Sequence, residues 1–231
     1  MGTARRFLRS FRSAPMTLLD LSHPIWPGMP KIPVLPDVEI DPVTSIAGGA
    51  PMNIKALRLA LHVGTHIDAP VHIVESGRSI DELPTERFDR HAVVSTVDRK
   101  PGEEITVDDL LAGGPPPQAG DFLFVHTGWD VKFETADYDD FPSLSPEAAE
   151  WAVAQGVSLV GSDTLTPDLP VHRRGTGFTF PVHRTLLSQD VLIGENLRNL
   201  GPLAGRRVRV RAFPLAVRGG DAGPARIVAE Y

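Results

Sequence analysis

Residues 62–72 have the sequence HVGTHIDAPVH, which contains three histidines and one aspartate. These are His62, His66, Asp68 and His72, separated by four, two and four positions. Imidazole nitrogens and carboxylate oxygens are common protein ligands of Zn²⁺ and similar divalent ions. Because the whole chain of 231 residues has only eight histidines, this cluster predicts a metal or catalytic site. A hydrogen-bonded structural cluster is the alternative.

No regular element can bring these side chains to one ion. In a straight strand, His62 and His66 would lie about 13 Å apart, too far to share an ion whose bonds are about 2 Å long. In a continuous helix, Asp68 would lie about 200° around the axis from His66. The chain must therefore bend, and Gly64 and Pro70 are suited to a bend and to a chain break. We expect a strand that leads into a bent loop with converging side chains.

The composition indicates an ordinary globular protein, and 231 residues suffice for one domain with a sizeable core. A net charge of −6 argues against a nucleic-acid partner, and no long apolar run predicts a membrane span. The chain has no cysteine, so disulfides and thiolate ligands are excluded and a metal must be bound by histidine and carboxylate. A cytoplasmic location is expected. The 22 prolines and 21 glycines predict many turns and short strands.

The first 15 residues are basic and contain no acidic residue. The arginines are Arg5, Arg6, Arg9 and Arg12. We expect residues 1–15 to form a disordered basic tail in front of one domain, residues 16–231. A transit peptide or translation from Met16 are alternatives, and no apolar core typical of a secretory signal follows the arginines.

The hydrophobic pattern predicts short strands and a few short helices. Strands are expected at residues 17–21, 53–61, 91–98, 121–126, 157–160, 191–193, 206–217 and 225–230. Helices are expected at residues 107–112, at residues 147–155 and from His183 onward. The Gly- and Ala-rich segment 41–52 is expected to be a loop, either a flap near the site or a plain connection. The strand at 53–61 would deliver His62 to the site.

The stretch HVGTHIDAPVH resembles the signature His-x-Gly-Thr-His-x-Asp-x-Pro-x-His of the cyclase-like metal-dependent hydrolases. That family includes bacterial kynurenine formamidase and isatin hydrolase. The match is complete at every fixed position, and weaker cues extend the resemblance from about Leu18 to the C-terminus. The resemblance implies an α/β fold: a swivelling β/β/α domain with a mixed, barrel-like sheet and few short helices. It also implies a homodimer or homotetramer.

The resemblance further implies a metal centre. His62, His66 and Asp68 would bind one ion. His183 and Glu195 are similar in separation and placement to a metal-binding His and Glu of kynurenine formamidase. They would bind a second ion, with Asp68 and Glu195 as bridging ligands. Zn²⁺ is expected, with Mn²⁺ as the alternative, and either one or two ions per subunit fit the pattern.

Three further residues have expected roles. His72 would be the general acid/base that protonates the leaving nitrogen after attack by a metal-activated water, because the pKa of imidazole is ordinarily near 6.5. Trp26 lies in a Trp-Pro-Gly setting similar to that of a pocket residue of kynurenine formamidase, and would either bind substrate or pack. Asp163 would either orient a metal ligand or stabilise a turn.

These features predict a metal-dependent hydrolase that cleaves the C–N bond of a small amide. An arylformamidase that converts N-formylkynurenine to kynurenine and formate is the preferred activity. Hydrolysis of isatin, a cyclic imide or a lactam is an alternative, as is a polyketide cyclase or dehydratase with the same metal centre. A non-catalytic metal-binding protein is the third class. Formamidases tend to have a second histidine after the position of His183, and Arg184 stands here instead, which weakens the specific formamidase assignment.

Overall fold

The computed structural model describes residues 17–231, so the expected basic tail at residues 1–15 lies outside the described residues. The strands are β1 Leu18–Asp20, β2 Glu39–Thr44, β3 Ile54–Arg58, β4 His66–Asp68, β5 Asp89–Thr96, β6 Glu104–Ile105, β7 Phe122–His126, β8 Ser143–Leu144, β9 Leu159–Ser162, β10 Leu192–Glu195, β11 Arg207–Pro214 and β12 Ala222–Glu230. The α-helices are α1 Val107–Gly113, α2 Pro146–Ala154 and α3 Pro181–Ser188. None of the helices within residues 17–231 has the length and hydropathy needed to cross a membrane.

The main sheet closes into a barrel-like structure. Its strands follow the order β1-β12-β11-β5-β7-β9-β10-β4, and β4 pairs with β12 as well as with β10. The β5, β7, β9 and β10 neighbours are parallel, while the other pairs of this sheet are antiparallel. The mixed, barrel-like sheet with few short helices that the family resemblance implied is therefore confirmed.

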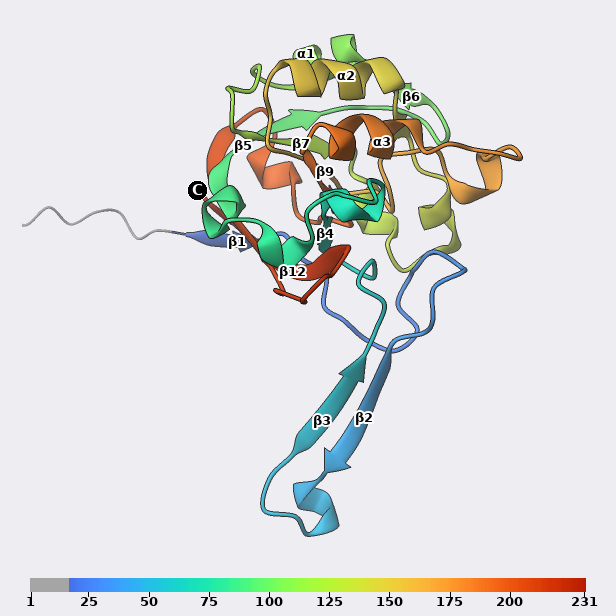
Figure 1. Cartoon of the computed structure of the whole chain (residues 1–231), viewed down its shortest axis with the longest axis vertical. Coiled ribbons are helices and arrows are strands. Elements are labelled where there is room, and N and C mark those ends of the chain that lie inside the picture. The colour runs from blue at the N-terminus through green and yellow to red at the C-terminus, as the bar shows by residue number, and fades with distance from the viewer. Residues whose placement is uncertain (1–16) are drawn as a thin grey trace, which may run out of the picture.

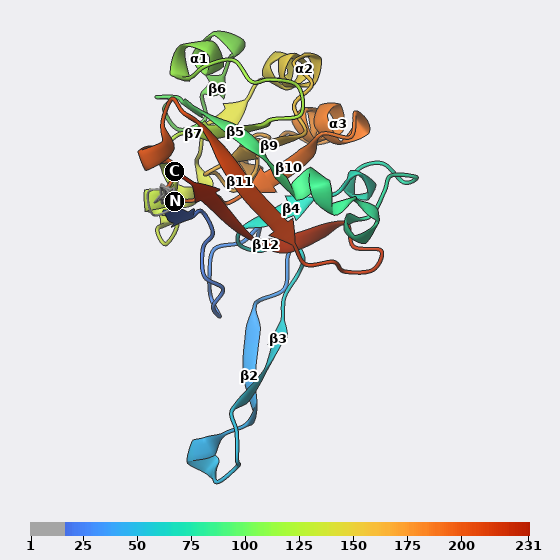
Figure 2. The same cartoon turned by 90° about the vertical axis from the view of Figure 1, so that its left-hand side faces the viewer.

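Helices α1, α2 and α3 cover one side of the barrel (Figures 1 and 2). Their apolar side chains, such as Leu110 and Leu186, form a buried cluster with Val125 of β7 and Val160 of β9. Local sequence signals determine where these helices begin. Thr106 and its partner three residues later form a capping box for α1, and α2 begins with a serine cap followed by proline.

Strand β4 has three residues and closes the sheet by pairing with both β10 and β12. All three of its residues are buried. Ile67 belongs to the apolar core, whereas His66 and Asp68 point to the opposite side because side chains alternate along a strand. The register places His66 opposite Glu195 of β10, and Asp68 opposite Ala222 of β12. Barrel closure therefore brings the signature together with the C-terminal third of the chain.

Three predicted elements need correction. Residues 41–44, expected in a loop, belong to β2, and residues 54–58 form β3 without reaching His62. These two strands pair only with each other and form a hairpin that projects from the barrel (Figures 1 and 2). The final strand begins at Ala222 rather than residue 225, because β4 provides it with a second pairing partner.

Candidate metal centre and pocket

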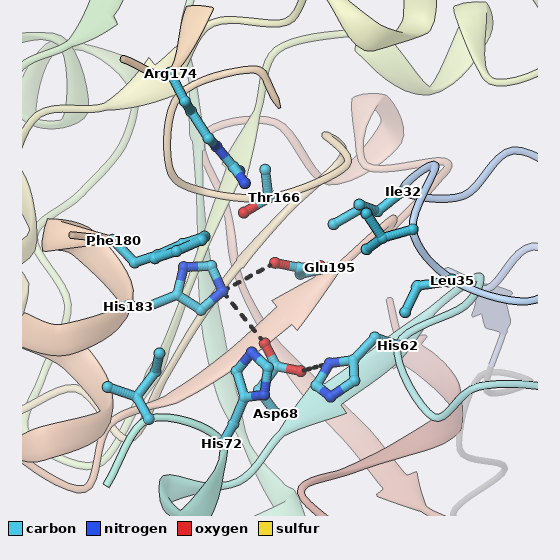
Figure 3. A pocket seen from close by; sticks show the side chains of 12 residues that line it. Ile32, Leu35, His62, Asp68, His72, Thr166, Arg174, Phe180, His183 and Glu195 are labelled. Carbon is cyan, nitrogen blue, oxygen red and sulfur yellow. Dashed lines mark ion pairs between the residues drawn. The ribbon is translucent and has the colours of Figure 1, made fainter. Parts of the chain in front are cut away.

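Five side chains from three separate parts of the chain converge on one point, and four of them, His62, Asp68, His183 and Glu195, are drawn in Figure 3. His62 Nδ1 lies 2.8 Å and His66 Nε2 lies 3.2 Å from Asp68 Oδ1. His183 Nε2 lies 3.7 Å from Asp68 Oδ2 and 3.4 Å from Glu195 Oε1. Glu195 Oε2 is 3.3 Å from His66 Nε2. The structure thus brings together all five residues that the sequence predicts as metal ligands.

The bend in the signature occurs at Gly64, which has a φ of +68°. A Cβ atom at this position would lie 2.9 Å from the end of the Met29 side chain, so both conformation and space favour glycine. The Gly64 carbonyl accepts hydrogen bonds from His66 Nδ1 at 2.8 Å and from Asn196 Nδ2 at 3.1 Å. Thr65 Oγ1 donates to the Asn196 carbonyl at 2.6 Å. These bonds fix the bend against the residue that follows Glu195. The predicted order is reversed, since the bend precedes the strand.

Each imidazole of the cluster is anchored through one nitrogen. A carbonyl can only accept, so His66 carries a proton on Nδ1 and directs Nε2 at the carboxylates. His183 Nδ1 lies 2.5 Å from Asp168 Oδ2, and His62 Nε2 lies 3.0 Å from Asp221 Oδ2. In each case the opposite nitrogen faces Asp68. Metal-binding histidines usually donate their second N–H to such an acceptor, which fixes tautomer and ring orientation.

Hydrogen bonding within the described chain leaves the centre incomplete. His66 Nε2 and both Asp68 carboxylate oxygens are buried and have no hydrogen-bond partner among residues 17–231. Buried polar atoms without a partner are costly, so these three require another group. Nitrogen and oxygen donors around a buried point suit a divalent ion such as Zn²⁺ or Mn²⁺. The residues therefore fit a metal ion.

The pKa shifts of the buried histidines also favour a metal ion at this centre. Burial by itself lowers the pKa of His183, but Asp168 and Glu195 outweigh it and raise the value to about 10. Burial likewise opposes the charged form of His66, and the neighbouring carboxylates Asp68 and Glu195 raise its pKa well above its ordinary value. The two carboxylates thus make the centre strongly attractive to positive charge, which a divalent ion can supply.

His72 differs from the anchored histidines. Its Nδ1 lies 3.6 Å from Asp221 Oδ2, which is outside hydrogen-bond distance. Its ring lies 4.2 Å from the His62 ring and 5.8 Å from the His183 ring, and its side chain is 29% exposed. Burial lowers its pKa. Nitrogen atoms of His72 and His183 and an Asp68 oxygen lie close enough together to hold a metal ion, so geometry alone permits either a ligand or a proton-transfer role.

Four of the five converging residues, all except the fully buried His66, line a cavity of about 320 Å³. Its other walls are largely apolar, with Ile32, Leu35, Ile73 and Phe180, and they include one guanidinium, that of Arg174 (Figure 3). Phe180 adopts a φ of +54° directly before α3, an unusual conformation for a bulky residue. A cavity of this size and character suits a small, mostly apolar ligand.

The structure also shows the surroundings of Trp26 and Asp163. Trp26 is not among the cavity-lining residues; it packs edge-on against Phe133, with ring centroids 5.8 Å apart. The chain after it turns Ile32 and Leu35 into the cavity instead. Asp163 stabilises a turn, because its carboxylate accepts hydrogen bonds from the backbone N–H groups of residues 127–129.

The sequence analysis missed Asp168, Asp221 and Arg174. Asp168 lies only five residues after Asp163, yet spacing alone could not show which aspartate meets His183. Asp221 follows two glycines, a pattern typical of a turn, and nothing in that pattern indicates a contact with His62. No local pattern marks Arg174, which the chain places in the cavity wall through tertiary contacts.

Comparisons with known proteins show which family the chain resembles. Residues 19–169 match the protein family described as "Putative cyclase". A curated relative, kynurenine formamidase of Bordetella petrii, is 30% identical over 214 residues, which cover 91% of this chain and 96% of the relative.

Solved structures show the same fold. Isatin hydrolase A from Ralstonia solanacearum superimposes with a TM-score of 0.82 at 24% identity, covering 93% of this chain and 92% of that one. A structure titled as a potential metal-dependent hydrolase with cyclase activity has a TM-score of 0.75 at 29% identity, covering 93% and 98% of the two chains.

Proposed function

This chain belongs to the cyclase family, and from that membership we propose that it is a metal-dependent hydrolase of a small amide C–N bond. The activity best supported is that of an arylformamidase, which converts N-formylkynurenine to kynurenine and formate. The similarity to kynurenine formamidase over nearly the full length of both chains supports this substrate class.

The observation that carries the proposal is the common arrangement of three imidazoles. His62, His66 and His183 are each anchored through one nitrogen and present the other to Asp68 or Glu195. In a purely structural cluster, His66 Nε2 and the two Asp68 oxygens would be expected to form well-directed hydrogen bonds, whereas within residues 17–231 they have ion-pair contacts alone.

We propose that these five residues hold one or two divalent ions, with Zn²⁺ favoured over Mn²⁺ because histidine and carboxylate ligands suit it. His62, His66 and Asp68 would hold the first ion, and His183 and Glu195 would complete a second site together with Asp68. When bound, such an ion polarises an amide carbonyl and makes water more acidic.

The protein residues supply positioning and proton transfer. We propose that His72 gives a proton to the amide nitrogen as the C–N bond breaks, so that the amine leaves in neutral form. His72 first takes this proton from the attacking water, which fits a pKa that burial holds below its ordinary value, and formate is the second product. Apolar residues such as Ile32 and Phe180 would hold the aryl group and limit access of other water molecules.

Removal and return of the metal tests the function. We expect purified protein to contain zinc or manganese by elemental analysis and to release kynurenine from N-formylkynurenine. Activity should fall to background after dialysis against a chelator and return when Zn²⁺ or Mn²⁺ is added, because the five side chains alone offer no comparable Lewis acid. Full activity in metal-free protein would contradict the proposal.

The same assay addresses the main alternative. The fold match to isatin hydrolase A makes cyclic amides a second candidate class. Isatin and a simple lactam are therefore assayed beside N-formylkynurenine. A kcat/KM for isatin far above that for N-formylkynurenine would move the assignment to cyclic amides.

We also propose that the chain forms a homo-oligomer, with a second copy covering the projecting hairpin. All five residues of β3 are exposed. The exposed large apolar side chains of the hairpin are Val43, Ile46, Met52, Ile54 and Leu57. A two-stranded ribbon is barely stable alone in water, and a group of exposed apolar residues typically marks an interface.

Charges placed on the hairpin should separate the subunits. We expect the double variant Ile54→Lys, Leu57→Lys to lose at least half of the mass of the wild-type particle in light scattering after size exclusion, because two lysines oppose apolar burial. Leu111→Lys on α1 is the control, since Leu111 is 47% exposed against 51% for Leu57. A monomeric wild type, or a double variant of unchanged mass, would refute this assignment.

A further inference from the structure

Arg174 is a charged residue in the wall of an otherwise apolar part of the cavity. Its guanidinium points toward the space above Thr166, His183 and Glu195 (Figure 3). The metal centre described above does not involve Arg174. This residue is not one of the candidate ligands, and it forms no hydrogen bond with the residues that anchor those ligands.

The side chain of Arg174 is held in place at its base. Its Nε donates to the Leu169 carbonyl at 2.8 Å. Its Cζ lies 5.2 Å from the centre of the Phe178 ring and 4.9 Å from that of Phe180, within the range of cation–π contacts. These contacts orient the planar group and leave its two terminal nitrogens toward the cavity.

The charge of Arg174 has no ion-pair partner within residues 17–231. Neighbouring Arg173, by contrast, pairs with Asp140 at 2.7 Å outside the cavity. Burial lowers the pKa of Arg174, and the more distant carboxylates Asp168 and Glu195 only partly offset this. A half-buried guanidinium without a partner gains from an anionic ligand more than a solvated one does.

We propose that Arg174 binds a carboxylate carried by the substrate at a position remote from the scissile amide, and so selects amides that bear a carboxylate over amides that lack one. This inference rests on the proposed amide hydrolase function. A planar carboxylate matches the paired N–H donors of a guanidinium. The metal centre receives the amide carbonyl, the apolar walls receive the body of the substrate, and Arg174 receives its charged end.

This arrangement distinguishes the two candidate substrate classes. N-Formylkynurenine carries an amino-acid carboxylate separated from the formamide by an aryl ketone, whereas isatin is neutral before hydrolysis. Arg174 therefore favours the open-chain, carboxylate-bearing amide.

A pair of substrates and a pair of variants test the inference. N-Formylkynurenine is compared with 2-formamidoacetophenone, which has the same aryl ketone and formamide but no carboxylate. We expect Arg174→Gln to raise KM for N-formylkynurenine by about 10- to 100-fold, the range for a lost hydrogen-bonded charge contact, with little change in kcat. KM for 2-formamidoacetophenone should change by less than about twofold. Arg174→Lys keeps the positive charge but not the paired N–H donors, so its KM for N-formylkynurenine should lie between those of wild type and Arg174→Gln.

Arg173→Gln is the matched control, since it removes the same charge one residue away and outside the cavity. An equal rise in KM for both substrates after Arg174→Gln, or a fall in kcat alone, would overturn the inference. Either result would mean that Arg174 acts on the reacting atoms, since such an effect does not depend on a remote carboxylate.

Binding of products by calorimetry separates this inference from the proposed function. Metal-loaded wild type should bind kynurenine more tightly than 2-aminoacetophenone, and Arg174→Gln should remove that preference. If neither formamide is hydrolysed but wild type still binds kynurenine more tightly than 2-aminoacetophenone, the proposed hydrolase function is wrong and the carboxylate site at Arg174 is supported. If wild type binds both compounds equally, the subsite fails.

Discussion

Replacing Asp68 with asparagine is expected to remove bound metal and hydrolytic activity together. Asp68 is completely buried and faces His62, His66 and His183 at 2.8, 3.2 and 3.7 Å. Asparagine keeps the size of the side chain but removes its negative charge, which the ion needs. Loss of a residue that merely orients a ligand costs about 10- to 100-fold in metal affinity or activity, so loss of this central carboxylate should exceed about 100-fold.

Metal content by elemental analysis and kcat/KM for N-formylkynurenine are the two measurements for Asp68→Asn. Asp121→Asn is the control, because Asp121 is also buried but pairs with Arg207 at 2.8 Å, away from the metal centre. That variant should lose stability and keep its metal. A folded Asp68→Asn protein with normal metal content would show that the ligand assignment is wrong.

His72→Gln is expected to keep the metal and lose turnover. Its nitrogens are not anchored as those of the other three histidines are, and it lines the cavity beside the centre. General acid catalysis contributes about 10²- to 10⁴-fold, so kcat should fall by that factor.

The leaving group provides an internal control for His72. An anilide nitrogen must be protonated to leave, whereas the nitrophenolate of 4-nitrophenyl formate leaves without a proton. We expect His72→Gln to impair hydrolysis of N-formylkynurenine far more than hydrolysis of this ester. Metal loss in step with activity would instead make His72 a ligand, the role that its closeness to Asp68 and His183 also permits.

The residues with the clearest local signals were predictable from the sequence. The spacing within residues 62–72 required a bend, and Gly64 provides it with a positive φ. The helices expected at residues 107–112 and 147–155 begin within one residue of the predicted starts, because the capping residues Thr106 and Ser145 act over a few consecutive positions. The resemblance to kynurenine formamidase outside the signature added His183 and Glu195, which the structure places close to Asp68 and His66.

Contacts between distant segments were not predictable in the same way. The pairing of β4 with both β10 and β12 depends on closure of the whole sheet, and this closure sets Asp221 beside His62 across 159 positions. Similarly, Asp168 rather than Asp163 meets His183, although both lie in one loop. The projecting hairpin was not predicted, because the two-residue alternation of side chains is the same in a strand of the barrel and in a strand outside it.

By itself, then, the sequence determined the candidate metal-binding side chains, the bend that lets them converge and the family to which the chain is similar, because these follow from residue chemistry and short spacings. Only the tertiary structure decided which carboxylates anchor the histidines, that Trp26 packs away from the cavity, and that Arg174 lies within it. Those features depend on how a closed sheet and its covering loops bring distant residues together, and no local pattern records that geometry.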